Sequence, residues 1–224
     1  MRTLAYSLLF LGLFSCGGEE VVETDTPEIP EQVLPYFGEK EVEMIEVDGE
    51  MVADTIYHVV PEYIFTDQDS NLFTNENVEG KIHVANFFFT SCPAICPAMI
   101  EQMRRLQENT SDIEELSFLS HTIDPKRDTI PKLQAYIAER ELNTDNWSFL
   151  YDSDRDYIHD LAKTGYIINA MEDEEADGGF LHSEHFILID REGHIRGLYE
   201  GTDPAKVDLL EADIRKLIKE EYGE

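Results

Sequence analysis

Two cysteines, Cys92 and Cys96, lie four positions apart in the stretch TSCPAICP. Residues at that spacing on a helix lie on one face about one turn apart, so the two sulfurs can share one metal ion or form one disulfide. The start of a helix offers unpaired amide hydrogens and the positive end of the helix dipole, which favour thiolate over thiol. Pro93 and Pro97 suit a first helical turn. The pattern therefore predicts a reactive or metal-binding pair at the first turn of a helix, rather than two inert buried cysteines.

The donor types bear on which metal the pair would hold. Two thiolates are soft ligands, and with one imidazole they form a three-coordinate set suited to Cu(I), whereas zinc usually takes four ligands. Copper is therefore preferred over zinc. The same dithiol can also exchange disulfides with another protein, so a redox role stays open.

The segments on either side place the cysteines between a strand and a helix. Residues 82–89 are almost continuously apolar, as in a central strand. After the cysteines, Met99, Met103 and Leu106 fall on one face of a helix. We therefore expect the two methionines to pack in the core rather than to bind metal.

From Pro61 onward, strand-like and helix-like segments alternate, which is typical of an α/β domain with a sheet covered by helices. Asp128 is expected to cap a helix, and the acidic stretch 171–179 is expected to be a solvated loop. Further strands are expected at residues 63–66, 116–121, 147–151, 186–190 and 195–199, and further helices at 154–163 and from residue 204 onward.

These motifs resemble the Sco (SenC-like) family of copper proteins involved in cytochrome c oxidase assembly. The signature of that family, CPxxxCP, follows an apolar strand, as CPAICP does at residues 92–97. The segment TIDPKRDT at residues 122–129 is similar to the DPxxDT segment of the family. His182 stands eleven residues before Gly193 of a predicted hairpin, as the copper-binding histidine of the family does. The three motifs occur in the family's order, and the resemblance covers the chain from about Pro61 to its end.

The resemblance implies a thioredoxin-like α/β fold with a central mixed β-sheet flanked by helices and with an N-terminal extension. It implies that Cys92, Cys96 and His182 bind copper, as Cu(I) or Cu(II), and that the two cysteines form a disulfide when oxidised. Such a protein would receive copper from an upstream donor, or electrons from a thiol reductant. It would deliver copper to the oxidase subunit that carries the CuA centre.

Two neighbouring histidines compete for the ligand position. His182 and His185 are three positions apart and would point to opposite faces of one strand, so only one can face the sulfurs. The spacing to Gly193 favours His182. Asp124 and Asp128 are expected to brace the loop beside the site rather than to bind metal. The histidines expected at the surface or in packing are His83, His121, His159 and His194.

Two other functions stay open beside copper delivery. A thiol:disulfide oxidoreductase would use Cys92 as the attacking thiolate and Cys96 as its partner, to reduce the oxidase subunit or another envelope protein. A redox or copper sensor would deliver no metal. No proline occurs between Pro131 and Pro204, where thioredoxin-like oxidoreductases commonly carry a cis-proline facing the cysteines. A copper chaperone is therefore preferred over an enzyme.

The N-terminus predicts export. A short apolar run at residues 4–14, too short to span a bilayer, ends at LFSC. That ending resembles a bacterial lipobox, in which the cysteine, here Cys16, is lipidated; an ordinary secretory signal peptide is the alternative. We predict a signal peptide at 1–15, an acidic tether with a small hairpin at 16–60, and the folded domain at 61–224. The protein would then be lipid-anchored to a membrane of the bacterial cell envelope, facing the periplasm.

The charge balance limits the partners. The chain has 48 acidic residues against 17 basic ones, for a formal net charge of −31. Nucleic acids and anionic membrane surfaces are disfavoured, because phosphate binding requires clustered lysine and arginine. A partner steered by charge should be basic. With Cys16 in the anchor, only Cys92 and Cys96 remain, too few for a disulfide scaffold.

Overall fold

The computed structural model describes residues 33–47, 49–168, 170–172, 180–182 and 184–223, and at 170–172 and 180–182 it describes the backbone. No helix within these ranges is long and apolar enough to cross a membrane. The predicted signal peptide, the lipidated Cys16 and residues 173–179 of the acidic stretch lie outside the described residues.

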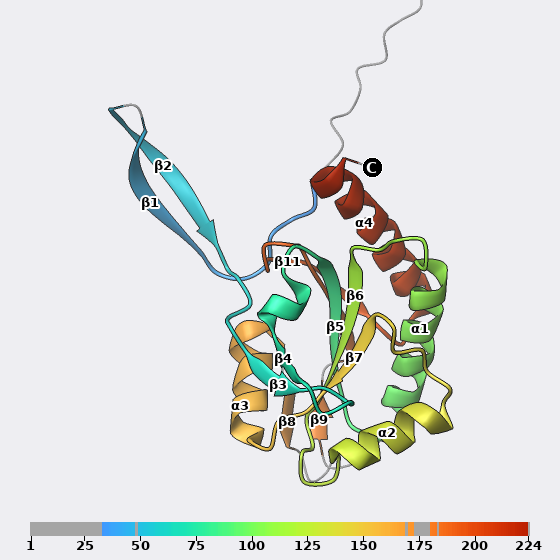
Figure 1. The fold of residues 1–224 in the computed structure, drawn as a ribbon. Coiled ribbons are helices and arrows are strands. Elements are labelled where there is room, and N and C mark those ends of the chain that lie inside the picture. The colour runs from blue at the N-terminus through green and yellow to red at the C-terminus, as the bar shows by residue number, and fades with distance from the viewer. Residues whose placement is uncertain (1–32, 48, 169, 173–179, 183, 224) are drawn as a thin grey trace, which may run out of the picture. The chain divides into compact units, whose positions relative to one another are not determined.

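A five-stranded sheet forms the centre of the fold (Figure 1). β5, β6 and β7 run parallel, whereas β10 runs antiparallel to both β5 and β11. The sheet is therefore mixed, as expected, and the end of β5 lies at the same edge of the sheet as the start of β10. The strands are β11 (Ile195–Glu200), β10 (His185–Ile189), β5 (Ile82–Phe88), β6 (Leu116–Thr122) and β7 (Trp147–Leu150), in that spatial order.

Helices cover both faces of this sheet. α1 and α4 lie side by side on one face, and α3 lies on the other (Figure 1). Surface ion pairs join the first two: Arg105 contacts Asp208 at 2.6 Å, and Arg215 contacts Asp112 at 2.8 Å. The helical segments are α1 (Ile95–Asn109), α2 (Ile130–Glu139), α3 (Arg155–Asp160), α4 (Pro204–Tyr222), the short 3-10 turn η1 (Asn75–Val78) and the π-helical turn η2 (Leu161–Gly165).

Burial follows the predicted apolar patterns. Every residue of β5 and β6 is buried, because helices cover both faces of these central strands. Met99 and Met103 of α1 are fully buried, which confirms that they pack in the core. The buried stripe of α4 consists of Val207, Leu210, Ile214, Leu217 and Ile218.

Two helix boundaries differ from the expectation. Thr129, not Asp128, is the N-cap residue of α2. The carboxylate of Asp128 is held by other hydrogen bonds and is therefore not free to cap the helix. The helix expected at 154–163 ends as α-helix at Asp160, and the chain continues to Gly165 as the π-helical η2.

Three two-stranded hairpins accompany the central sheet. The hairpin suggested within residues 41–57 is present, as β1 (Lys40–Val47) and β2 (Glu50–Tyr57). A second hairpin pairs β3 (Ile64–Thr66) with β4 (Leu72–Thr74). The acidic stretch expected as loop throughout has paired strands at its ends, β8 (Ala170–Glu172) and β9 (Phe180–His182), because cross-strand bonds satisfy the backbone there.

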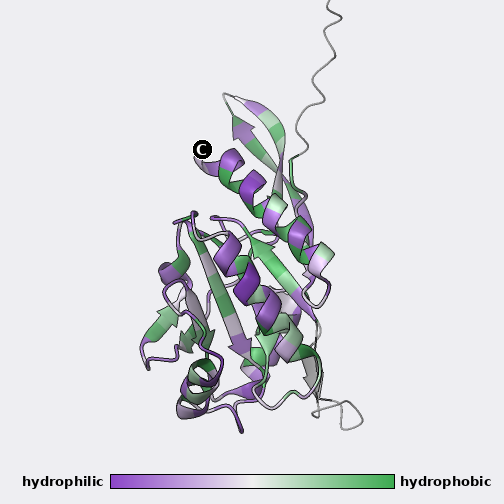
Figure 2. Ribbon diagram, turned by 90° about the vertical axis from the view of Figure 1, so that its right-hand side faces the viewer, coloured by the Kyte–Doolittle hydropathy of each residue, from purple (hydrophilic) through white to green (hydrophobic). Residues whose placement is uncertain are grey.

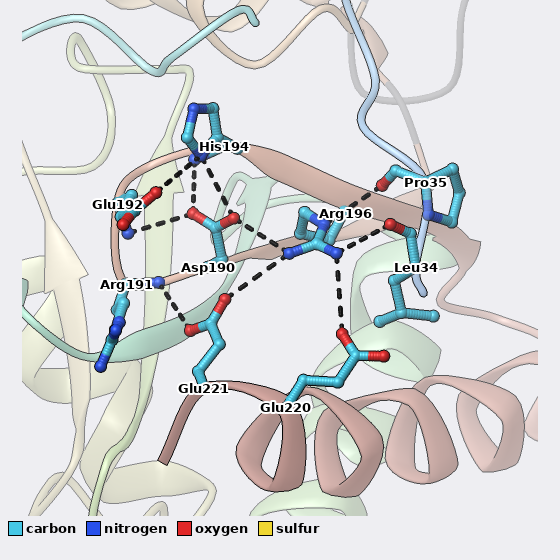
Figure 3. Close-up of polar contacts among 9 residues, drawn as sticks. All are labelled: Leu34, Pro35, Asp190, Arg191, Glu192, His194, Arg196, Glu220 and Glu221. Atoms are coloured by element: carbon cyan, nitrogen blue, oxygen red, sulfur yellow. Dashed lines mark hydrogen bonds and ion pairs between the residues drawn. The ribbon is translucent and has the colours of Figure 1, made fainter. Parts of the chain in front are cut away.

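A buried arginine joins three separate parts of the chain (Figure 3). Arg196 of β11 is only 3% exposed and donates to Asp190, at the end of β10, at 3.2 Å. Because a buried charge is tolerated only when it is paired, these contacts fix the segment before β1 and the end of α4 against β11. The other partners of Arg196 are the carbonyls of Leu34 (2.7 Å) and Pro35 (3.3 Å) and the carboxylates of Glu220 (3.8 Å) and Glu221 (3.5 Å).

Candidate metal and thiol site

Cys92 and Cys96 lie where β5 leads into α1. A turn closed by the hydrogen bond from the Cys92 amide to the Phe89 carbonyl (3.2 Å) carries the chain towards the helix. α1 begins at Ile95 after a non-helical Ala94, so Cys96 lies in the first turn and Cys92 lies before it. This corrects the expectation that both cysteines belong to the first turn. The amide of Cys96 nevertheless donates to Sγ of Cys92 at 3.4 Å, so that sulfur lies against the helix N-terminus.

Neither cysteine forms a disulfide, and both are buried, with Cys92 7% and Cys96 1% exposed. The hydrogen bond to the Cys92 side chain, together with burial, raises the pKa of the Cys96 thiol above its usual value. The helix start was expected to favour thiolate, but here burial removes the water that would stabilise the charge. Cys96 therefore keeps its proton in the reduced, metal-free protein, and Cys92 is the more accessible sulfur.

Asp128 holds the cysteine loop in place through buried hydrogen bonds. Its carboxylate is fully buried and accepts hydrogen bonds from the amide of Thr90 (2.9 Å), from the hydroxyl of Thr90 and from the hydroxyl of Thr122 (2.6 Å). Thr90 lies two residues before Cys92, and Thr122 ends β6. The carboxylate thus ties the loop to the neighbouring strand, in agreement with the bracing role expected for it.

Asp124 also stabilises the loop after β6. Its side chain is buried and forms an ion pair with Arg127, and its carbonyl accepts from the amides of Arg127 (3.1 Å) and Asp128 (2.9 Å). Burial, opposed by Arg127, raises the pKa of the Asp124 carboxyl above its usual value. The turn that it organises holds Asp128 in position.

Tyr136 of α2 is a neighbour of the cysteines that the sequence identified only as a packing residue. Its hydroxyl is buried and makes no hydrogen bond in the described part of the chain. Burial raises the pKa of Tyr136, and the nearby Cys96, Cys92 and Asp128 raise it further. The helical periodicity around Tyr136 predicts an inward-facing side chain, but no sequence signal predicts that it lies near the sulfurs.

The backbone places His182 at the same edge of the sheet as the cysteine loop. β9 ends at His182, and β10 begins at His185, so the two histidines lie on different strands and not on opposite faces of one strand as expected. β10 pairs with β5 antiparallel, with Ile187 opposite Ala85, so its start is beside the end of β5 that leads to Cys92. The side chain of His182 lies outside the described residues, and its role as a ligand stays a prediction.

The other four histidines considered in the sequence are packing or hydrogen-bonding residues. His121 is fully buried, stacks on Phe87 with ring centroids 4.8 Å apart and contacts Phe65 and Tyr166. It therefore lies in the core rather than at the cysteine loop. His83 is also buried; the ring of His159 donates to the Ile123 carbonyl (3.3 Å), and His194 contacts Asp190 (3.2 Å).

The structure describes only part of a ligand set for a soft metal ion, namely the sulfurs of Cys92 and Cys96. Among the side chains that the structure describes, no group of three or more histidine, cysteine or acidic residues is arranged to hold a metal. Two neighbouring thiols that are not joined in a disulfide supply two soft ligands. A complete three-coordinate set depends on the imidazole of His182.

The mixed sheet, the flanking helices and the cysteines at the end of β5 define a thioredoxin-like protein with a dithiol at a helix start. A family model described as SCO1/SenC matches residues 52–219. The chain belongs to this family.

Relatives agree with that assignment. A SCO1 protein homolog from Bacillus subtilis is 26% identical over 170 residues, which are 75% of this chain and 86% of the relative. The structure of a SCO1/SenC family lipoprotein from Bacillus anthracis is 28% identical, with a TM-score of 0.66, and covers 71% of this chain and 95% of that one.

Two further solved structures are similar to this chain, one described with a disulfide switch and one with bound copper. BsSco, described with a disulfide switch and as a member of the Sco family of cytochrome c oxidase assembly proteins, is 26% identical, with a TM-score of 0.64 over 71% of this chain and 93% of that one. ScoI from Bradyrhizobium japonicum was solved with copper bound. At 22% identity and a TM-score of 0.55, over 71% of this chain and 99% of that one, it supports the fold alone.

Proposed function

We propose that the protein binds copper through Cys92, Cys96 and His182 and delivers it to the CuA site of a cytochrome c oxidase subunit during assembly. The observation that carries the proposal is the pair of neighbouring thiols at the start of α1, which are not joined in a disulfide, with Sγ of Cys92 accepting from the Cys96 amide at 3.4 Å. The backbone of His182 lies at the same sheet edge. The match to the SCO1/SenC family model and the assembly role given for BsSco support the proposal.

Copper suits this donor set chemically. Two thiolates and one imidazole match the softness and low coordination number of Cu(I), and Cu(II) can follow on oxidation. Both thiols must lose their protons on binding, so uptake releases protons. Ligand exchange would pass the ion from an upstream donor to this chain and then to the acceptor subunit.

A thiol:disulfide oxidoreductase is the second candidate, favoured by the unequal exposure of the cysteines. Cys92, the more exposed sulfur, would attack a disulfide of the oxidase subunit or another envelope protein and release one acceptor thiol. Cys96 would then attack the sulfur of Cys92 in the mixed disulfide. This step releases the second acceptor thiol and leaves a Cys92–Cys96 disulfide. A separate thiol reductant must restore the dithiol. The disulfide switch given for BsSco supports this reading.

Competition for Cu(I) with a chromophoric chelator separates the candidates. The reduced protein is expected to withdraw one copper ion per chain. Cys92→Ser, Cys96→Ser and His182→Ala should each lower the apparent affinity by about 100-fold or more, because each removes one of three ligands. His185→Ala is the matched control and should keep the affinity of the unmodified chain.

Two outcomes would contradict copper delivery. If His182→Ala binds copper normally while the protein rapidly reduces a mixed-disulfide substrate, the oxidoreductase proposal replaces it. If the copper-loaded protein holds its ion in the presence of an apo-CuA domain, the protein is a sensor or store rather than a donor.

We further propose that Cys16 is lipidated and holds the protein on a membrane of the bacterial cell envelope. The export-type N-terminus and the description of the Bacillus anthracis relative as a lipoprotein support this. Cells fed a labelled fatty acid should label the unmodified protein but not Cys16→Ser, and the variant should leave the membrane fraction. Label on the Cys16→Ser protein would contradict the assignment.

A further inference from the structure

The β1–β2 hairpin exposes a row of large apolar side chains. Val42, Met44 and Met51 are 63%, 58% and 61% exposed, although side chains of this kind are usually buried. Both strands carry hydrophobic and hydrophilic residues (Figure 2), and these alternate from Glu41 to Met44. The match to the SCO1/SenC family model begins at residue 52, so β1 lies outside the matched stretch. The family resemblance therefore gives no role for this hairpin.

The register places four of the five carboxylates described in the hairpin on one face, which we call the acidic face. Paired residues share a face, and Val42 pairs with Thr55, Met44 with Ala53, and Glu46 with Met51. We call the surface formed by Val42, Met44, Met51, Ala53 and Thr55 the Met44 face. The opposite face carries the carboxylates of Glu41, Glu43, Glu50 and Asp54, interleaved with the apolar side chains of Ile45, Val47, Val52 and Ile56.

The hairpin is held firmly at its base. Tyr57 stacks on Tyr36 with ring centroids 4.1 Å apart, and the guanidinium of Arg196 lies 4.3 Å from the centre of the Tyr36 ring. Just after β2, the amide of His58 donates to the Glu39 carbonyl at 3.1 Å. From this base the two strands extend away from the five-stranded sheet (Figure 1). The Met44 face is therefore presented by an anchored element.

Both long edges of the hairpin are open. β1 and β2 form a sheet of two strands, and no third strand of the described chain pairs with either. An open edge presents unpaired amides and carbonyls that can receive another strand. An added strand continues both faces, because its side chains alternate between them.

Charge decides which strand fits. Residues 40–57 contain six acidic residues and one lysine. A second copy of this chain, with a net charge of −31, would be repelled, and residues 17–32 contain no lysine or arginine that could pair with the carboxylates. The fitting occupant has apolar side chains in line with the Met44 face and basic side chains in line with the acidic face.

We propose that the β1–β2 hairpin is a docking site for an extended segment of a partner protein in which basic and apolar residues alternate. The segment adds as a third strand to an open edge. At the edge of β1, its apolar residues extend the Met44 face and its lysines or arginines contact Glu41 and Glu43, with Asp54 one strand further away. The proposal is independent of copper binding.

Fluorescence anisotropy with labelled peptides tests the proposal on the full chain. The probes are the alternating peptide KVKIKVKIK and the peptide VIVIKKKKK, which has the same composition and charge in blocks. At about 0.15 M salt the alternating peptide is expected to bind about tenfold more tightly. The triple variant Val42→Thr, Met44→Thr, Met51→Thr should lose that preference while keeping β-propensity. The control double variant Ile64→Thr, Leu72→Thr removes equally exposed residues from β3–β4 and should keep it.

A second variant keeps the test valid if the threonine variant loses its hairpin. Glu41→Gln, Glu43→Gln, Asp54→Asn should weaken the alternating peptide about tenfold and reduce the salt dependence of binding. Equal binding of both peptides would overturn the proposal. So would a dimer in sedimentation velocity that the threonine variant abolishes, or flotation with phosphatidylcholine vesicles that depends on the Met44 face. Each variant should bind copper as the unmodified chain does, so failure here is distinct from failure of the copper proposal.

Discussion

Asp128 connects residues that are distant in sequence. Its buried carboxylate accepts from Thr90, 38 positions earlier, and from Thr122, at the end of the neighbouring strand. The loop that carries Cys92 therefore depends on the side chain of Asp128. The described hydrogen bonds of Asp128 join it to Thr90 and Thr122 and not to either sulfur. A buried acceptor of this kind is costly to alter, because its donors cannot turn to water.

Asp128→Asn is expected to loosen the cysteine loop. The amide nitrogen cannot accept, so at least one of the three hydrogen bonds is lost, at a cost of about 1–3 kcal/mol in the free energy of unfolding. Copper affinity should fall about 10–100-fold, as for other groups that orient metal ligands. Urea denaturation and chelator competition measure the two effects. The control Asp112→Asn alters a fully exposed carboxylate and should change neither; an unchanged copper affinity in Asp128→Asn would contradict the bracing role.

Individual side chains also mark the limit of prediction from sequence. The two cysteines, their helix and the bracing aspartates were predicted, because spacing and residue type are local signals. The raised pKa of Cys96 and the position of Tyr136 were not, since the first depends on the contact with Cys92 and on burial, and the second on the approach of α2 to the cysteines. Sequence placed Asp128 in a helix cap because it could not show Thr90 and Thr122 competing for its carboxylate.

Among the helices and strands, prediction succeeded where a buried stripe repeats over several turns. α1 and α4 were recognised in this way, and β5 was recognised as a continuous apolar run. It failed where short-range pairing decides the structure, as for β8 and β9, whose three-residue strands carry no periodic signal. The π-helical turn η2 likewise depends on local bonding, with the Tyr166 amide donating to the Leu161 carbonyl at 2.9 Å.

Arg196 determines how β11, the end of α4 and the segment before β1 are joined. Arg196→Met removes the guanidinium partner of the buried Asp190 and leaves the carbonyls of Leu34 and Pro35 without their donor. The expected loss is about 3–5 kcal/mol of unfolding free energy, as for other broken buried ion pairs. Hydrogen exchange should also rise at Phe37, whose amide donates to β11.

The matched control is Arg104→Met, which removes an exposed arginine that pairs with Glu101 and Glu108 on the surface of α1. Its denaturation midpoint should stay near that of the unmodified chain, because exposed ion pairs contribute little. Equal midpoints for the two variants would show that Arg196 does not hold these elements together.

Across the folded chain, two buried histidines make stability depend on pH. Burial lowers the pKa of His83 to about 4 and that of His121 to about 3. In the unfolded chain both should titrate near pH 6.5. Below that pH the unfolded chain binds protons that the folded chain refuses, so the stabilising effect is fully present above pH 6.5 and is lost as the pH falls towards the folded pKa values.

The unfolding free energy should therefore fall by roughly 2 kcal/mol between pH 6.5 and pH 5.5, about half of it from each histidine. Urea denaturation across this range measures the slope. His121→Phe keeps an aromatic ring against Phe87, Phe65 and Tyr166 and should remove about half of the slope. Asp124 and Glu221, whose pKa values burial raises, act in the opposite direction at lower pH, but equally in both proteins. The same slope in the two proteins would mean that His121 is protonated within the fold.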